Sequence, residues 1–276
     1  MDFVHKPDGT ISLNIDQIER EIITKVTSAA RARVRRSVGL RDRLRDQRQS
    51  REIGRGRVET ERAARELGPV SADGMGVVLI GVSTGGPGTL EEILPELPAD
   101  FPWPVVVAQH MPGSFTTVFA RRLNEMCKLT VVEAAHMMPL QPGVVYIAKG
   151  DADAAIAKRA TGFVINPMPA GTQYLWHPSV SRLVDSAMKV MPLDRIIGVL
   201  LTGMGDDGAE QMTELRRQGG RTIAQDENTS IIFGMPGELV KRGGASLVLP
   251  AGRIAGQLAL WLTPGPRERG HGLRQK

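Results

Sequence analysis

Short, continuous runs of apolar residues recur from residue 77 onward, and a helix pattern follows each of the first three. The runs occupy residues 77–80, 105–108 and 196–201, and the helix patterns after them occupy 90–94, 115–126 and 209–218. Two more runs, at 222–224 and 246–249, come near the end of the chain. β-Branched runs that alternate with helices are typical of strands buried on both faces of a parallel sheet. The sequence therefore predicts an α/β fold: a doubly wound, mostly parallel sheet with helices on both faces, in three layers.

Two further segments, 144–148 and 162–166, also have the composition of strands. We expect them to form a small antiparallel pair, similar to a hairpin, beside the main sheet.

The net charge of +5 originates in one segment of the 276-residue chain. Residues 31–66 hold 13 arginines and 6 acidic residues, whereas residues 67–276 are neutral overall. An arm that binds nucleic acid or an acidic partner is one interpretation, but the segment has no lysine and no aromatic residue to stack on bases. We favour a linker and expect no nucleic-acid partner.

No apolar run reaches the roughly 18 residues of a transmembrane helix, and the first residues lack the apolar stretch of a signal peptide. The single cysteine, Cys127, excludes an internal disulfide and gives no thiol cluster for a metal. We therefore expect a cytoplasmic protein without membrane insertion.

Three loops that follow predicted strands contain reactive side chains. The first, 81–88, matches G-x-S-x-G between a strand and a helix, which makes Ser83 a candidate nucleophile near a helix N-terminus. The alternative is a glycine-rich turn that only reverses the chain. A nucleotide P-loop is excluded because no Lys-Ser/Thr follows the second glycine.

The second loop, 109–112, follows the run at 105–108 directly and contains His110. A structural histidine is the alternative for His110 taken by itself. Beside a serine nucleophile on a neighbouring strand, however, an imidazole is the group suited to accept the serine proton.

The third loop, 202–209, allows two interpretations. Gly203, Gly205 and Gly208 spell G-x-G-x-x-G, and Asp226 lies 18 residues beyond Gly208, where a ribose-binding acid of a dinucleotide site would be expected. Asp206 and Asp207 would place two negative charges beside the pyrophosphate, however, and either one can instead orient His110. Ser83, His110 and one of these aspartates then form a Ser-His-Asp set at three strand ends.

Six segments occur in this order along the chain: IGVSTGGP (80–87), QHMP (109–112), HPSV (177–180), LLTGMGDDGA (200–209), TIAQDE (222–227) and FGMP (233–236). Because of these segments, residues 77–262 resemble the catalytic domain of the bacterial chemotaxis protein-glutamate methylesterase family. The resemblance implies a catalytic triad of Ser83, His110 and Asp207, with Thr84, Gly85, Met204 and Gly205 lining the oxyanion and substrate site. It implies no cofactor and no metal.

The implied reaction is hydrolysis of glutamyl methyl esters on the cytoplasmic domains of methylated chemoreceptors, with glutamine deamidation as a further activity. A non-catalytic module that docks on receptors and a dinucleotide-binding oxidoreductase are the alternatives.

Residues 1–9 and the apolar residues at helical spacing over 15–29 resemble the last strand, Lys-Pro loop and last helix of a receiver domain. We therefore expect a receiver remnant at 1–31, an Arg-rich linker at 32–75, the catalytic domain at 76–263 and a disordered tail at 264–276. A truncated gene product and a start placed too late both explain the remnant. A full receiver upstream would imply a phosphodonor kinase as partner.

The sequence departs from the family pattern in two places. Leu175, Trp176 and His177 stand where Arg-His-Arg is usual, and Ser181 replaces an aspartate. In the segment 148–153, Lys149 and Asp153 replace a proline and a histidine. We expect differences in receptor affinity or substrate choice at these positions.

Overall fold

The computed structural model of the chain describes residue 23 and residues 74–262. Nearly all of the expected receiver remnant and of the Arg-rich linker, and the whole tail, lie outside the described residues, so these domain assignments stay predictions.

A seven-stranded sheet forms the centre of the fold, and all of its strand pairs are parallel. Its strand order is β10-β9-β8-β1-β2-β5-β3. The strands are β1 (Val77–Val82), β2 (Val105–Gln109), β3 (Thr130–Ala134), β5 (Val144–Ala148), β8 (Ile196–Leu200), β9 (Arg221–Gln225) and β10 (Leu247–Leu249). The predicted doubly wound α/β fold is confirmed.

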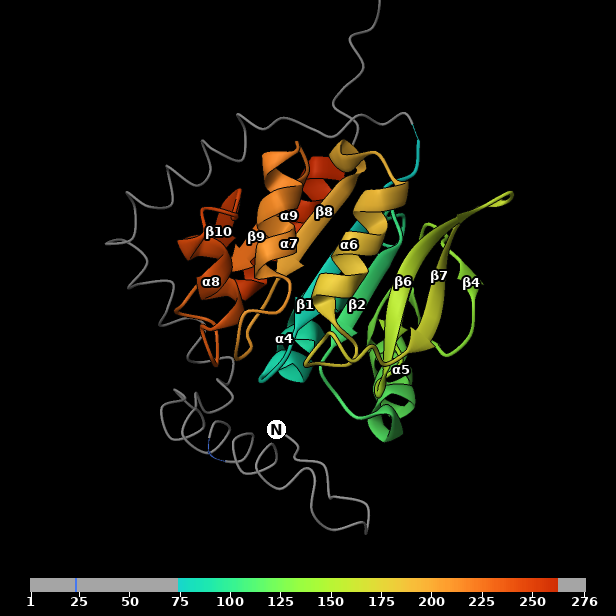
Figure 1. The fold of residues 1–276 in the computed structure, drawn as a ribbon, viewed down its shortest axis with the longest axis horizontal. Helices are drawn as coiled ribbons and strands as arrows, with labels where there is room; N and C mark the ends of the chain where they lie inside the picture. Colours follow the sequence, from blue (N-terminus) through green and yellow to red (C-terminus); the bar gives the residue numbers. More distant parts are fainter. Residues whose placement is uncertain (1–22, 24–73, 263–276) are drawn as a thin grey trace, which may run out of the picture.

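Helices cover both faces of this sheet, as Figure 1 shows. One face carries α4 (Gly86–Ile93), α5 (Gly113–Met126) and α9 (Ala251–Leu262). The other face carries α6 (Val180–Val190), α7 (Ala209–Arg217) and α8 (Met235–Lys241). Short 3₁₀ turns, η1 (Leu94–Glu96) and η2 (Leu193–Arg195), complete the connections.

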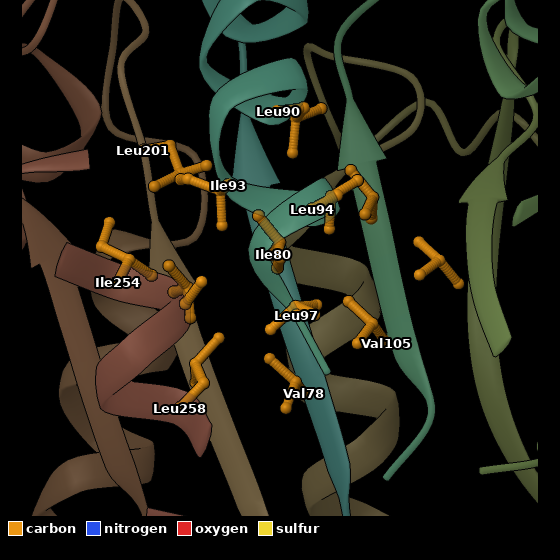
Figure 2. Close-up of a cluster of buried hydrophobic side chains, with 14 of the residues drawn as sticks. Val78, Ile80, Leu90, Ile93, Leu94, Leu97, Val105, Leu201, Ile254 and Leu258 are labelled. Carbon is orange, nitrogen blue, oxygen red and sulfur yellow. The ribbon is translucent and has the colours of Figure 1, made fainter. Parts of the chain in front are cut away.

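Each face of the sheet has its own hydrophobic core because successive side chains of a strand point to opposite sides. In β1, Val78 and Ile80 pack with α4 and α9, whereas Val77 and Leu79 pack toward α6 and α7. Figure 2 shows the first of these cores, in which the side chains of Leu90 and Leu258 lie over the strands. Cys127, just after α5, is half-buried against this core, and burial raises the pKa of its thiol to about 11.

A second sheet is antiparallel and has the order β4-β7-β6. Its strands are β4 (Met138–Pro139), β6 (Ala152–Arg159) and β7 (Gly162–Pro169). The expected pairing of 144–148 with 162–166 is wrong: the first segment is β5, between β2 and β3 in the parallel sheet, and the second lies in β7, which pairs with β6 and β4. Strand β6 escaped prediction because its alanines and charged residues lack an apolar run.

After β1 the chain forms β2, which is one neighbour of β1 in the sheet. It later forms β8, which is the other neighbour. This reversal places a topological switch point at β1, where ligands of open α/β sheets bind at the carboxyl ends of the strands. Within residues 74–262, no helix is long and apolar enough to cross a bilayer.

Candidate active site

The three reactive loops meet at the carboxyl ends of the adjacent strands β8, β1 and β2. Ser83 follows β1 directly, and its backbone N–H donates to the carbonyl of Thr202 after β8, at 3.0 Å. His110 follows β2, and its N–H donates to the carbonyl of Val82, at 3.0 Å. Ladder hydrogen bonds therefore extend past the strand ends and fix Ser83 between the other two loops.

His110 and Asp207 form a buried pair, with 2.9 Å between the imidazole Nε2 and a carboxylate oxygen. Each side chain is only 7% exposed. In the part of the chain that the structure describes, Nδ1 of His110 is buried and has no hydrogen-bond partner. Since Asp207 occupies Nε2, Nδ1 is the ring nitrogen left to exchange a proton with a substrate or a nucleophile.

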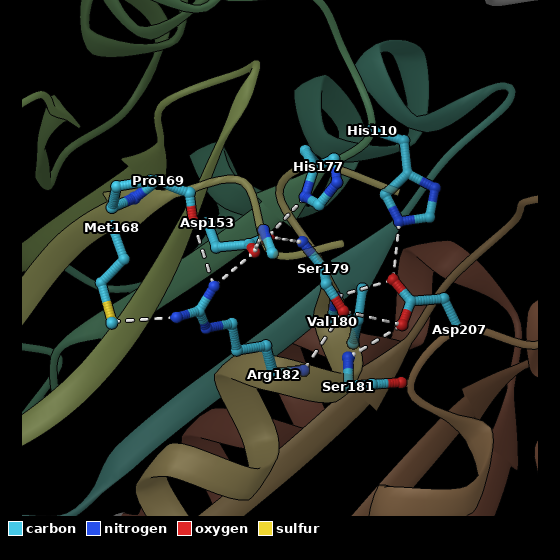
Figure 3. Close-up of polar contacts among 11 residues, drawn as sticks. His110, Asp153, Met168, Pro169, His177, Ser179, Val180, Ser181, Arg182 and Asp207 are labelled. Atoms are coloured by element: carbon cyan, nitrogen blue, oxygen red, sulfur yellow. Dashed lines mark hydrogen bonds and ion pairs between the residues drawn. The ribbon is translucent and has the colours of Figure 1, made fainter. Parts of the chain in front are cut away.

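Asp207 is held by the N-terminus of α6 as well as by His110 (Figure 3). Its oxygens accept from the backbone N–H groups of Val180, at 2.7 Å, and Ser181, at 2.9 Å, and from the hydroxyl of Ser179, at 3.2 Å. Burial alone would raise the pKa of this carboxyl, but the hydrogen bonds from His110 and Ser181 and the charge of His110 lower it. Asp207 is thus kept ionised by free N–H groups and the positive end of a helix.

Asp206, by contrast, is exposed and lies 3.5 Å from the guanidinium of Arg242. Of the two neighbouring aspartates, only Asp207 reaches His110.

The main chain around Ser83 is held on three sides. Gly85, in the left-handed conformation with φ 85°, caps α4, and the N–H of Gly86 donates to the carbonyl of Ser83. The hydroxyl of Thr202 donates to the carbonyl of Thr84, at 3.0 Å. A methyl group on Gly203 would lie 2.6 Å from Cβ of Ser83, so the turn after β8 packs directly against the serine.

Gln109 connects Ser83 to His110, and sequence reasoning gave this side chain no role. Its amide Nε2 donates to the carbonyl of Ser83 and to the carbonyl of His110, each at 3.1 Å. Gln109 is the last residue of β2 and is buried, so its side chain points along the sheet edge toward both loops. A polar residue that ends a buried strand was the available signal.

The register of β1 and β2 pairs Val82 with Gln109, which places Ser83 and His110 one step further on neighbouring strands. No hydrogen bond joins the hydroxyl of Ser83 to His110 within residues 74–262. Catalytic hydrogen bonds are often formed only in the substrate complex.

The residues expected to line the substrate site lie on two sides of Ser83. Thr84 and Gly85 lead into α4, while Met204 and Gly205 form the turn after β8. Gly205 also lines an open hollow of about 470 Å³, together with Asp206, Phe233, Gly234, Gly237 and Glu238. None of Ser83, His110 and Asp207 lines this hollow, which adjoins the site through Gly205 and Asp206.

For Trp176 the sequence predicts only an effect on receptor affinity or substrate choice, but its indole stacks on the His110 ring with 5.3 Å between centroids and 12° between planes. Asp226, the possible ribose-binding residue, accepts from the N–H and the hydroxyl of Thr229 in its own turn. Within the described residues, no group of three His, Cys, Asp or Glu side chains could hold a metal ion.

Comparisons with known proteins give a consistent result. Residues 78–258 match the model of the family described as CheB methylesterase. A protein-glutamate methylesterase/protein-glutamine glutaminase of Rhodospirillum rubrum is 69% identical over 95% of this chain and 70% of its own length. One from Rhodopseudomonas palustris is 48% identical over 95% of this chain and 71% of its own length. The crystal structure of the Thermotoga maritima CheB methylesterase catalytic domain superposes with a TM-score of 0.64 at 38% identity, covering 67% of this chain and 97% of that domain.

Proposed function

This chain belongs to the CheB methylesterase family and is a protein-glutamate methylesterase/protein-glutamine glutaminase of chemotaxis, and we propose that Ser83, His110 and Asp207 carry its hydrolytic reaction. The observation that carries the assignment is the buried His110–Asp207 hydrogen bond, located on strand ends that flank Ser83. Ser83 is the nucleophile, His110 the general base and then acid, and Asp207 the carboxylate that orients the imidazole.

In the first half of the reaction, the hydroxyl oxygen of Ser83 attacks the carbonyl carbon of the glutamyl methyl ester, and its proton passes to Nδ1 of His110. The charge that the imidazole gains is stabilised by Asp207, which the N-terminus of α6 keeps ionised. His110 then returns the proton to the departing methoxide, methanol leaves, and a glutamyl ester remains on Ser83.

In the second half, a water molecule gives a proton to His110 and attacks the same carbonyl carbon. The bond to Ser83 breaks, and His110 protonates the serine oxygen. Glutamine deamidation follows the same sequence with ammonia as the leaving group. The negative charge on the tetrahedral intermediate develops beside Thr84 and Gly85, where α4 begins and where the helix dipole favours an anion.

The family implies chemoreceptors as substrates, and we propose that the methylated cytoplasmic domains of such receptors bind across Ser83, between α4 and the turn containing Gly205. A cytoplasmic location is part of this proposal, because the substrate glutamates lie there.

The test is methanol release from membranes that contain methylated chemoreceptors. Ser83→Ala should abolish release, because it removes the oxygen that forms the acyl intermediate, while a matched Ser114→Ala change on the exposed start of α5 should leave it intact. Mass spectrometry should detect the glutamyl ester on Ser83 of the unaltered protein. Release that persists in the Ser83→Ala protein would refute the assignment, and receptor binding without any release would favour a docking module.

A further inference from the structure

Three of the positions at which the sequence departs from the family pattern meet in one place beside the catalytic pair. Asp153, at the start of β6, bonds His177 in the segment between β7 and α6, and the neighbouring Trp176 lies on the ring of His110. The stacking contact joins Trp176, which lies outside the triad, to His110, which carries the proton.

The stacking contact limits how the His110 ring can move. One hydrogen bond, from Nε2 to Asp207, holds the imidazole. This bond by itself would still let the ring rotate about the Nε2–Asp207 direction. An aromatic plane that lies nearly parallel to the ring opposes that rotation. The indole also extends toward Gly205, since a methyl group there would lie 3.9 Å from the indole nitrogen, so Trp176 covers the space between His110 and the turn after β8.

Asp153 holds the segment that carries Trp176 at both of its ends, and Figure 3 shows its bonds to His177, Ser179 and Arg182. One carboxylate oxygen accepts from the N–H of Gly171, at 3.1 Å, and the other from the N–H of Ser179, at 2.9 Å, and the imidazole of His177, at 2.9 Å. The guanidinium of Arg182 adds an ion pair of 2.7 Å. The Asp153 side chain has no exposed surface, while His177 and Arg182 are 23% and 19% exposed, so a buried carboxylate is held by charge-assisted bonds to partners that reach the surface.

We propose that Trp176 is a positioning residue for His110, and that Asp153 acts through Trp176 by fixing the segment 171–179. The inference rests on the proposed role of His110 as general base. A catalytic group must be held within about half an ångström of its working position by the side chains packed around it, and in this protein Trp176 supplies that packing.

The kinetic test compares Trp176→Phe, which keeps an aromatic plane, with Trp176→Ala, which removes it. Trp176→Ala should lower kcat for the methyl ester by roughly 3- to 10-fold and leave KM unchanged, because the stacking energy is lost from the positioned imidazole. Trp176→Phe should restore most of the rate. Leu260→Ala, which removes a 56% exposed apolar side chain from α9, should keep kcat. An unchanged kcat in Trp176→Ala, or a loss confined to KM, overturns the proposal.

A second readout does not depend on the natural substrate. A fluorophosphonate reacts with an activated serine: the serine oxygen bonds to phosphorus, fluoride leaves, and the serine proton goes to His110. Trp176→Ala should slow this labelling of Ser83, followed by mass spectrometry, as much as it lowers kcat. Slowed labelling in a protein that releases no methanol would support the positioning role and refute the methylesterase function. Equal labelling rates in both proteins, or no labelling of the unaltered protein, would overturn the positioning role.

The action of Asp153 is tested by a double-mutant cycle. Asp153→Asn should lower kcat, and the double variant with Trp176→Ala should be no slower than Trp176→Ala alone, because both changes release the same contact. Losses that multiply would show that Asp153 acts by another route. If Asp153→Asn fails to fold, Arg182→Met removes one of the four partners and keeps the other bonds, and the same cycle applies.

Discussion

Asp206 and Asp207 are adjacent in the sequence, yet their carboxylates have opposite surroundings. Asp206 is open to solvent beside Arg242, whereas Asp207 is buried between His110 and the first N–H groups of α6. Two glycines with a positive φ flank the pair: Gly205, with φ 83°, precedes it, and Gly208, with φ 85°, turns the chain into α7 and packs against Val180. This glycine-flanked turn places one aspartate in the site and leaves its neighbour outside.

Gln109 gives a prediction at this scale. Gln109→Met keeps the size of the side chain and removes the amide that donates to the carbonyls of Ser83 and His110. We expect kcat to fall by roughly 10-fold or more, with a loss of about 1–3 kcal/mol in the free energy of unfolding, since the carbonyl of His110 loses its side-chain donor and the carbonyl of Ser83 keeps only the N–H of Gly86.

Steady-state methanol release and urea unfolding measure the two effects. Gln218→Met, at an exposed position at the end of α7, is the matched control and should change neither. A Gln109→Met protein with unchanged kcat would mean that the strand ends hold Ser83 and His110 without the amide.

The sequence allowed Ser83, His110 and an aspartate of 206/207 to be placed together because each follows a strand and parallel strands end at one edge. It did not allow Gln109 or Trp176 to be assigned. The polar end of a buried strand marked Gln109, and a departure from the family pattern marked Trp176, but their partners lie 26 and 66 positions away in the sequence, and no local pattern encodes those contacts.

Among the elements, α6 has the largest part in the site, although no apolar run or glycine-rich turn in the sequence predicted this helix. Ser179 caps the helix by accepting from the N–H of Arg182, and the N–H groups of Val180 and Ser181 bind the Asp207 carboxylate. The continuous apolar runs predicted most strands of the main sheet. They failed for β6, whose polar and alanine residues form no apolar run; this strand pairs with β7 and packs against α6.

Gly256 lies on the exposed side of α9, and a methyl group there meets nothing within 4 Å. Gly256→Ala should therefore raise the free energy of unfolding by roughly 0.5–1 kcal/mol, because alanine loses less backbone entropy in a helix. Urea unfolding followed by circular dichroism is the measurement.

Gly203→Ala is the contrasting change, since its methyl group would lie 2.5 Å from the sulfur of Met235 and 2.6 Å from Cβ of Ser83. That variant should lose both stability and activity. A gain in the free energy of unfolding for Gly203→Ala, or a loss for Gly256→Ala, would contradict the packing described for the turn after β8 and for α9.

For the whole molecule, two buried carboxylates with lowered pKa values couple folding to pH. Burial alone would raise the pKa of Asp153, but the hydrogen bonds from His177, Ser179, Arg182 and Gly171 lower it, and Asp207 is lowered by His110 and Ser181. A carboxyl whose folded-state pKa is depressed stabilises the protein above its unfolded pKa of about 3.9, and this stability disappears as the pH falls through the folded-state value. Asp185, whose pKa burial raises, acts in the opposite direction.

The free energy of unfolding should therefore be flat near neutral pH and should fall below about pH 4. Asp153→Asn should be less stable than the unaltered protein at pH 7, and its stability should depend less on pH in the acidic range. Urea titrations between neutral and acidic pH provide the comparison, and curves that stay parallel down to the lowest pH would contradict the role of Asp153.

The bonds of Asp153 also have a consequence for how this domain can be recombined. The carboxylate belongs to β6, but two of its main-chain partners, Gly171 and Ser179, lie 18 and 26 positions later, beyond β7. A chimaera that exchanged the segment 171–182 with a relative and left residue 153 behind would separate a buried charge from its neutralising partners. Residue 153 and that segment therefore form one unit of inheritance, and gene-shuffling crossovers between them should be selected against even where each parent protein is active.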